Sequence, residues 1–202
     1  MAAVRRSRAL HGPFVAPPGT PAAYAEYLQR ARRPMQISFF VVERVTDELI
    51  GVVGLHDIVR DSRACGSLGY YAFEPFAGRG LMRAALELVI THAFRSLDFY
   101  RLEASIQPAN TRSVRLIEGL GFRRDDAPLH GLRIRGRWRD HRRWSLLEDD
   151  WLAVSPPAAP RPRIDARPRH AHPSNTASTA DVSTSNAAAA ARKPPVKASS
   201  AP

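Results

Sequence analysis

The segment from Phe76 to Phe94, FAGRGLMRAALELVITHAF, constrains the fold more than any other part of the chain. An apolar run, GSLGYYAFEP, leads into a turn with two glycines, and the turn opens a long amphipathic helix. Gly78 and Gly80 have no side chains, so a ligand can approach their backbone closely. The first turn of a helix leaves N–H donors unpaired and its dipole favours anions, which makes this turn a candidate phosphate or pyrophosphate site. The same pattern also fits a plain strand-to-helix turn.

A second strand–turn–helix unit follows directly. Residues 100–107, YRLEASIQ, alternate apolar and polar side chains, which is the period of a strand. Residues 108–122, PANTRSVRLIEGLGF, have a helical apolar face, with Asn110 as a predicted N-cap and Gly121 as the predicted helix stop. Two such units in succession predict an α/β fold in which a ligand lies across two adjacent strand ends.

The remaining elements follow from local signals. Thr20-Pro21 predicts a helix start. Trp138 and Trp144 are six residues apart, so we expect them to share one strand face and to pack in the core or at its rim. The other predicted strands are residues 37–43 and 49–55, a hairpin around Thr46-Asp47, residues 66–74, and residues 132–134 and 137–146, a hairpin around Arg135-Gly136.

The composition divides the chain in two. Residues 155–202 contain no aromatic residue and no leucine, and consist largely of Pro, Ala, Ser, Thr and Arg. Such a segment buries too little apolar surface to offset chain entropy, so we expect a disordered tail. Residues 1–154 are sufficient for one hydrophobic core and form the predicted domain.

The formal net charge is +11, and every lysine lies in the tail. A basic surface attracts nucleic acid, ribosomes or acidic cofactors without specifying which, and it is also consistent with a merely solvated surface. Cys65 is the single cysteine, so no intrachain disulfide is expected, and we interpret it as a small buried hydrophobe. No run of eighteen apolar residues exists, so we expect no transmembrane helix, no membrane partner and a cytoplasmic location. No metal site is predicted.

Three blocks in order, GYYAFEPFAGRGLM, RLEASIQPANTRSVRLIEGLGF and IRGRWRDH, resemble the GNAT N-acetyltransferases. Within that family they most resemble the bacterial RimJ type, which acetylates the N-terminal alanine of a ribosomal protein. The resemblance covers about Arg5 to Leu147. It implies the GNAT acyl-CoA N-acyltransferase fold, an α/β (α+β) mixed sheet with helices on both faces. It also implies acetyl-CoA as the donor and a primary amine as the acceptor, and we expect this amine to be a protein N-terminus.

The resemblance further implies how the donor is held. Main-chain N–H groups of the glycine turn would bind the pyrophosphate, the backbone of residues 68–73 would pair with the pantetheine arm, and Asn110 would orient the chain that leaves the second strand. The implied cofactor-binding residues are Tyr71, Ala72, Phe73, Gly78, Arg79, Gly80, Leu81, Met82 and Asn110.

Two catalytic residues are predicted, each with an alternative. Many family members carry a Tyr about where Ile117 stands, whereas relatives of the RimL and RimJ type carry a Ser that matches Ser113. Ser113 would reprotonate the CoA thiolate, or its hydroxyl caps the helix start. Glu103 lies in the middle of a strand and would act as a general base or position a water, or it is paired with an arginine.

Arg139, Asp140 and His141 also suggest a catalytic set. Neighbours on a strand point to opposite faces, however, which favours local ion pairing for these residues.

The chain departs from the family in two places. Family members open with a strand before the segment that resembles Arg5 to Leu28, so we expect this chain to be N-terminally short and to lack the first strand. Residues 125–131, DDAPLHG, also depart, and this region lies near the acceptor cleft in the family. The identity of the acceptor is therefore open.

The predicted reaction is direct attack of the amine on the thioester, since no activated Cys or Ser motif suggests an acyl-enzyme. One alternative acceptor is a small amine such as a polyamine. Another alternative is a non-catalytic basic module that contacts RNA or the ribosome weakly through its arginine-rich surface and tail.

Overall fold

One mixed sheet organises the protein, with the strand order β1-β2-β3-β4-β7-β5, and β6 pairs with β7 beside it. The computed structural model describes residues 1–126 and 129–154, and the predicted tail lies outside these residues. The β3–β4 pair is parallel and every other pair is antiparallel. The strands are β1 (Ile37–Val42), β2 (Leu49–Val59), β3 (Cys65–Ala72), β4 (Arg101–Ile106), β5 (Arg123–Arg124), β6 (His130–Ile134) and β7 (Arg137–Leu147).

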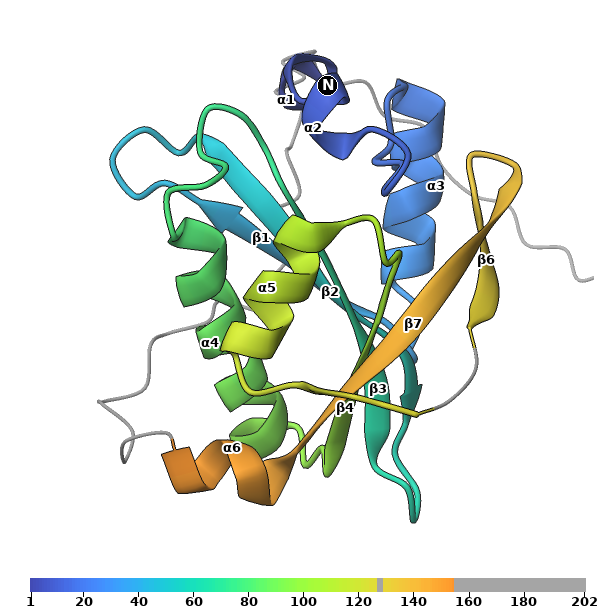
Figure 1. Ribbon diagram of the computed structural model, residues 1–202. Helices are drawn as coiled ribbons and strands as arrows, with labels where there is room; N and C mark the ends of the chain where they lie inside the picture. Colours follow the sequence, from blue (N-terminus) through green and yellow to red (C-terminus); the bar gives the residue numbers. More distant parts are fainter. Residues whose placement is uncertain (127–128, 155–202) are drawn as a thin grey trace, which may run out of the picture. The chain divides into compact units, whose positions relative to one another are not determined.

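Helices cover both faces of this sheet, as the resemblance implied (Figure 1). The long helix α4 and the shorter α5 lie on one face, and α3 lies on the other. No helix within the described residues combines the length and apolarity that a membrane span needs. The helices are α1 (Ala2–Arg6), α2 (Arg8–His11), α3 (Pro21–Ala31), α4 (Leu81–Ser96), α5 (Thr111–Gly119) and α6 (Glu148–Val154).

The predicted helix and turn signals are confirmed. The Thr20 hydroxyl accepts a hydrogen bond from the Ala23 N–H at 3.2 Å, which caps α3. The Asn110 side chain accepts from the Ser113 N–H at 3.3 Å, which caps α5. Gly121 has φ +90°, a conformation that favours glycine, and it follows Leu120, the C-cap residue of α5.

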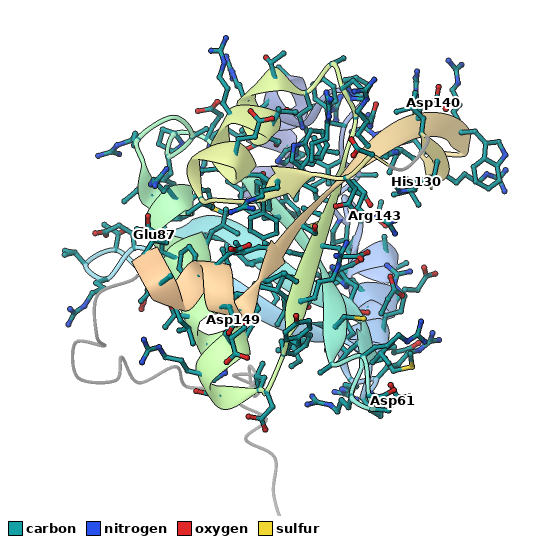
Figure 2. The ribbon with its side chains drawn as sticks, turned by 60° about the horizontal axis from the view of Figure 1, so that its bottom comes forward. Asp61, Glu87, His130, Asp140, Arg143 and Asp149 are labelled. Atoms are coloured by element: carbon teal, nitrogen blue, oxygen red, sulfur yellow. The ribbon has the colours of Figure 1, made fainter. Side chains whose placement is uncertain are left out.

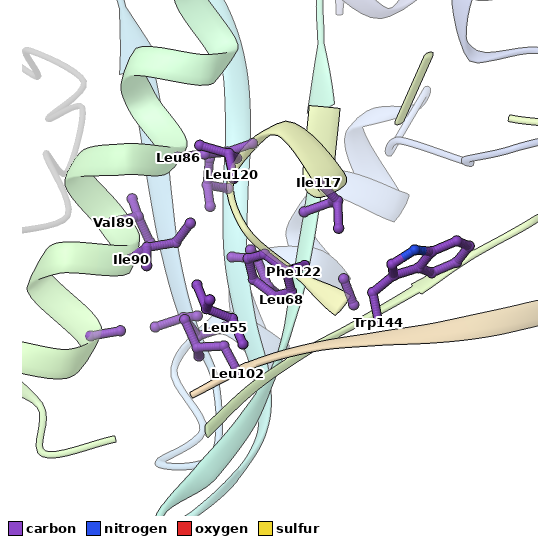
Figure 3. Packing of buried hydrophobic residues seen from close by; sticks show 14 of the residues in the cluster. Leu55, Leu68, Leu86, Val89, Ile90, Leu102, Ile117, Leu120, Phe122 and Trp144 are labelled. Carbon is purple, nitrogen blue, oxygen red and sulfur yellow. The ribbon is translucent and has the colours of Figure 1, made fainter. Parts of the chain in front are cut away.

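The core lies between the sheet and the helices α4 and α5 (Figure 3). Leu55, Leu86 and Leu102 are fully buried there. Trp144 is buried in this core, and its indole N–H donates to Glu118 at 3.3 Å. Trp138 contradicts the prediction, because 73% of it is exposed on the outer part of the β6–β7 hairpin. Cys65 is only half-buried at the start of β3.

The central strands β3 and β4 pair over a short stretch only. Their register runs from Cys65 opposite Arg101 to Ser67 opposite Glu103, and no pair follows. Beyond this point β3 stays paired with β2 as far as Ala72, and β4 stays paired with β7 as far as Ile106. The sheet therefore divides into two halves, and the inner edges of β3 and β4 carry backbone groups without a strand partner.

Burial lowers the pKa of four histidines, namely His11, His56, His92 and His141. In each case the main cause is loss of hydration, which disfavours the charged ring. The hydrogen bond from His11 to the Ala72 carbonyl and the one from His141 to the Arg139 carbonyl raise the pKa and so offset part of this effect. These four rings are more readily neutral in the folded protein than in the unfolded chain.

A first prediction concerns the close approach of β2 to the start of α4. A Cβ atom built on Gly51 would lie 2.5 Å from the Met82 Sδ atom and 2.7 Å from the Tyr71 carbonyl oxygen. Gly51→Ala should therefore lower the free energy of unfolding by about 1–3 kcal/mol in denaturant titrations, the usual cost of overpacking. Gly19→Ala is the matched control, because its Cβ would lie no closer than 4.0 Å to Val4. Equal stability of the two variants would contradict the packing described.

A second prediction concerns acid stability. Because the folded pKa of the four histidines is lowered, the unfolded chain binds more protons as the pH falls below about 6.5. The melting temperature should therefore be lower at pH 5.5 than at pH 7.5, measured in high salt to screen the repulsion within a basic chain. His92→Gln removes one of the four groups and should make the decrease smaller. A melting temperature that does not fall between these pH values would contradict the prediction.

Candidate active site

A cleft of about 1140 Å³ lies where β3 and β4 separate. Its walls come from β3, from the end of β4, from the first turn of α5 and from the N-terminal segment. Of the predicted cofactor-binding residues, Tyr71, Ala72, Gly78, Gly80, Met82 and Asn110 line it. Phe73, Arg79 and Leu81 are not among its lining residues: Phe73 is buried, and the Arg79 guanidinium lies 5.9 Å from the centre of the Phe76 ring.

The glycine turn, residues 78–80, lies at one end of this cleft, beside the N-terminus of helix α4. Gly78 and Gly80 both have φ +79°, and Gly80 is the N-cap of α4 with no side-chain cap. The Ala84 N–H, which bonds to the Gly80 carbonyl, makes the first bond of the helix. The N–H groups of the preceding helical residues are thus available to an anion, and no Cβ would meet an atom within 4 Å at either glycine.

Ser113 stands on the opposite wall, in the first turn of α5. Its backbone N–H is capped by Asn110, and its carbonyl accepts a 3.1 Å hydrogen bond from the Tyr70 hydroxyl. Asn110 therefore makes the cap that the alternative interpretation assigned to the Ser113 hydroxyl. Tyr70 was not predicted, although it joins β3 to α5 across the cleft, and its burial raises the pKa of the phenol.

Glu103 lies outside this cleft, within a network of ion pairs. Its carboxylate is 2.9 Å from Arg101 and 3.5 Å from Arg143, and the same two arginines bind Asp125 at 2.9 Å each. Ser145 also donates to Asp125, at 2.7 Å. The arginine pairing left open for Glu103 is thus the arrangement observed, and the structure does not bring Glu103 and Ser113 together in one site. A catalytic role for either residue stays a prediction.

His141 lines the cleft and is 4% exposed. Its Nδ1 atom is 2.7 Å from the Arg139 carbonyl oxygen. A carbonyl can only accept, so Nδ1 carries the hydrogen, and in the neutral ring Nε2 keeps a free lone pair. Because burial lowers the pKa of His141, this neutral form is favoured at neutral pH.

A second histidine lies opposite His141 on the neighbouring strand β6. Opposite it, His130 lies with its ring centre 6.2 Å away, and the His130 Nε2 atom is 3.0 Å from the Ser105 hydroxyl on the cleft wall. Figure 2 shows His130 and Arg143 near the body of the sheet and Asp140 farther out on the hairpin. Asp140 is exposed, and no ion pair among the described residues contains Arg139 or Asp140. The local ion pairing that we expected for these residues is therefore not observed there.

The N-terminal segment closes one side of the cleft and contacts both separated strands. His11 donates from Nε2 to the Ala72 carbonyl at 2.8 Å, and the buried Ser7 hydroxyl accepts from the Glu74 N–H at 2.9 Å. At the end of β4, the Gln107 amide donates to the carbonyl oxygens of Pro13 and Phe14 at 3.2 and 3.4 Å. Residues 7–14, here called the bridging segment, therefore link the end of β3 to the end of β4.

Known proteins with similar sequences include N-acetyltransferases. The chain is 32% identical over 125 residues to the probable N-acetyltransferase YjcK of Bacillus subtilis, which covers 62% of this chain and 69% of that protein. It is 36% identical over 104 residues to the ribosomal protein uS5-alanine N-acetyltransferase of Escherichia coli. That match covers 52% of this chain and 54% of the relative, so the chain spans only about half the length of the latter.

Solved structures give the same result for the fold. The ribosomal-protein-S5-alanine acetyltransferase of Vibrio fischeri superposes with a TM-score of 0.63 at 26% identity, over 74% of this chain and 86% of that one. A spermidine N-acetyltransferase of Vibrio cholerae, in complex with CoA and spermine, has a TM-score of 0.63 at 19% identity, over 74% and 88% of the two chains. Residues 2–123 match the family described as the acetyltransferase (GNAT) domain, and the protein therefore belongs to the GNAT family of N-acetyltransferases.

Proposed function

We propose that this protein transfers the acetyl group of acetyl-CoA to the N-terminal amine of a protein, such as a ribosomal protein. The observation that carries the proposal is the cleft between β3 and β4, which leads onto the uncapped N-terminus of α4. The printed names of two relatives, a uS5-alanine and an S5-alanine acetyltransferase, support this acceptor class.

The two ends of the cleft suit the two parts of CoA. On β3, alternate backbone N–H and C=O groups from Leu68 onward have no partner on β4, and the amides of a pantetheine arm can pair with them. The free N–H groups at the start of α4, next to Gly78 and Gly80, suit the pyrophosphate. The donor then crosses the cleft beside Ser113, Asn110 and the end of β4.

The chemistry needs one group to accept a proton and one to supply a proton. A protein N-terminus is mostly an ammonium group near neutral pH, so it must lose a proton before its nitrogen attacks the acetyl carbon. The new C–N bond forms, the C–S bond breaks, and the second N–H proton leaves the nitrogen while the thiolate gains one. Ser113 is our candidate donor to that thiolate, because it lies on the cleft wall and its backbone is fixed by Asn110 and Tyr70.

Between the two candidate bases, the geometry favours His141 over Glu103. His141 lines the cleft as a neutral ring with a free Nε2, whereas Glu103 is held between Arg101 and Arg143 outside it. A neutral imidazole is also closer in pKa to neutral pH than a carboxylate is, which suits proton transfer. We therefore assign the first proton transfer to His141 and leave Glu103 as the competing assignment.

Two other functions make different predictions for the same measurements. Acetylation of a small amine is suggested by a spermidine N(1)-acetyltransferase of Vibrio cholerae, 27% identical over 113 residues. A non-catalytic RNA- or ribosome-binding module would not bind acetyl-CoA at all. Calorimetry with acetyl-CoA separates an enzyme from such a module, and a panel of N-terminal peptides and polyamines separates the two acceptor classes.

A third prediction tests the donor site. Gly80→Glu should abolish acetyl-CoA binding in calorimetry, since it places a carboxylate at the end of the helix where the phosphates bind. Gly80→Ala is the matched control, because it brings the same strain of a positive φ without the charge. Both variants should stay folded, since a Cβ at this position meets no atom within 4 Å. Unchanged affinity in Gly80→Glu would remove this turn from the site.

A fourth prediction tests the base. If His141 accepts the proton, kcat should fall as the pH drops below the ordinary histidine pKa of about 6.5, and the midpoint should lie lower still because burial lowers the pKa of His141. The neighbouring groups that influence it are His130 and Asp140. His141→Gln should remove this fall of kcat at low pH, the acidic limb of the pH–rate profile, and should lower kcat by about 10²–10⁴-fold. The dissociation constant for acetyl-CoA should stay unchanged.

The control is His92→Gln on α4, another histidine with a lowered pKa that does not line the cleft. This variant should keep both the acidic limb of the pH–rate profile and the kcat of the unchanged enzyme. If Glu103 is the base instead, the loss of kcat at low pH disappears in Glu103→Gln and persists in His141→Gln. A His141→Gln enzyme with an intact limb and normal kcat would exclude His141 from proton transfer.

A further inference from the structure

A second, smaller cleft lies next to the one described above. It has a volume of about 330 Å³, and Gly12, Pro13 and Ile134 line it together with three arginines, Arg135, Arg137 and Arg139. Ile134 lines both clefts, and Gly12 and Pro13 belong to the bridging segment that also contributes His11 to the larger one. The smaller cleft, here called the arginine cleft, therefore adjoins the site proposed for the reaction.

The three arginines have no acidic partner in the described part of the chain. Every ion pair observed there involves other arginines, namely Arg6, Arg83, Arg101, Arg123 and Arg143. Arg135 donates one hydrogen bond, to the Val15 carbonyl at 3.4 Å. Arg137 and Arg139 alternate with Trp138 on β7 and so project from one face of the strand. Three positive charges around so small a volume create a site that favours an anion and repels a cation.

We propose that the arginine cleft binds an acidic side chain of the acceptor protein, close behind its N-terminal amine. This inference rests on the proposed function and names the substrate class more narrowly: protein N-termini followed by Asp or Glu. Guanidinium groups bind carboxylates through paired hydrogen bonds, which gives direction as well as charge complementarity. A polyamine, which is a cation along its whole length, is disfavoured by the same charges.

The geometry favours a peptide over RNA as the occupant. The cleft is small, at about 330 Å³, and no aromatic ring from the described residues lines it to stack on a base. Trp138, the exposed aromatic residue of the hairpin, alternates with Arg137 and Arg139 and projects from the other face of β7. The shared lining residue Ile134 also places the arginine cleft within reach of a chain whose first residue occupies the larger cleft.

The test compares two peptides that differ only in charge. Both begin with Ala, and one carries Glu where the other carries Gln at the third and fourth positions. Dissociation constants come from calorimetry without acetyl-CoA, and kcat/KM comes from release of the CoA thiol. The Glu peptide should be better in both measurements by about tenfold or more, the effect of one charge-assisted hydrogen bond, and the preference should shrink as salt is added.

Arg137→Gln combined with Arg139→Gln should remove this preference, so that the Glu peptide falls to the level of the Gln peptide. The affinity for acetyl-CoA should not change. Arg133→Gln is the matched control, because it removes one charge from the same hairpin, is exposed, and does not line the cleft. It should keep the preference for the Glu peptide.

The outcomes separate this inference from the proposed function. Equal binding and equal turnover of the two peptides would overturn the arginine cleft as an acceptor site and leave the proposed function standing. Tighter binding of the Glu peptide without any turnover would support the cleft and count against the proposed function. If a labelled oligouridylate loses affinity in the double variant while both peptides bind equally, the cleft is a nucleic-acid site and the inference is wrong.

Discussion

The early end of the β3–β4 pairing is the constraint on which the rest of the site depends. After Ser67 and Glu103 the two strands stay attached to different partners, β2 on one side and β7 on the other. Backbone donors and acceptors on the two inner edges then need partners that no strand provides, since leaving such groups buried and unpaired is costly. A ligand with amide groups of its own can satisfy them, so the gap in the sheet acts as a template for an extended molecule.

The charged groups around this gap are arranged by depth. Inside it, His11 and His141 are buried rings whose pKa is lowered by burial, and each donates one ring N–H to a backbone carbonyl. Beside it, the carboxylates of Glu103 and Asp125 are neutralised by Arg101 and Arg143. Among the described residues, Arg135, Arg137 and Arg139 on the β6–β7 hairpin have no acidic partner. Neutral rings inside the gap and positive charge beside it fit the proposed reaction, in which an amine loses its hydration and a charged acceptor is attracted.

Local sequence signals predicted most of the fold and one end of the site. Thr20, Asn110 and Gly121 act through neighbours within a few residues, and their predicted caps and stop are confirmed. The turn at Gly78 and Gly80 was likewise found from local pattern alone. The helices α1, α2 and α6 were not predicted, because they are only 5, 4 and 7 residues long and too short to show a periodic pattern.

Long-range contacts account for what the sequence could not predict. Glu103 is paired with Arg143, forty residues away, and the spacing of residues in the sequence does not predict that contact. The role that we propose for His141 as a base depends on the Arg139 carbonyl and on burial by other elements, which its position in an alternating strand does not reveal. Trp138 has the aromatic character of a core residue, yet it lies on a part of the hairpin that other elements do not cover. In the bridging segment, Ser7 and His11 gain their importance from Glu74 and Ala72, more than sixty residues away.

The bridging segment spans the gap between the ends of β3 and β4. Hydrogen bonds join His11 to Ala72 at the end of β3, and join Pro13 and Phe14 to Gln107 after the end of β4. A few residues of main chain therefore connect the two strand ends. Only the few residues from His11 to Phe14 separate these two attachment points, so the main chain between them can stretch very little. In the proposed reaction, the donor and the acceptor would share an opening that this short stretch of backbone closes on one side.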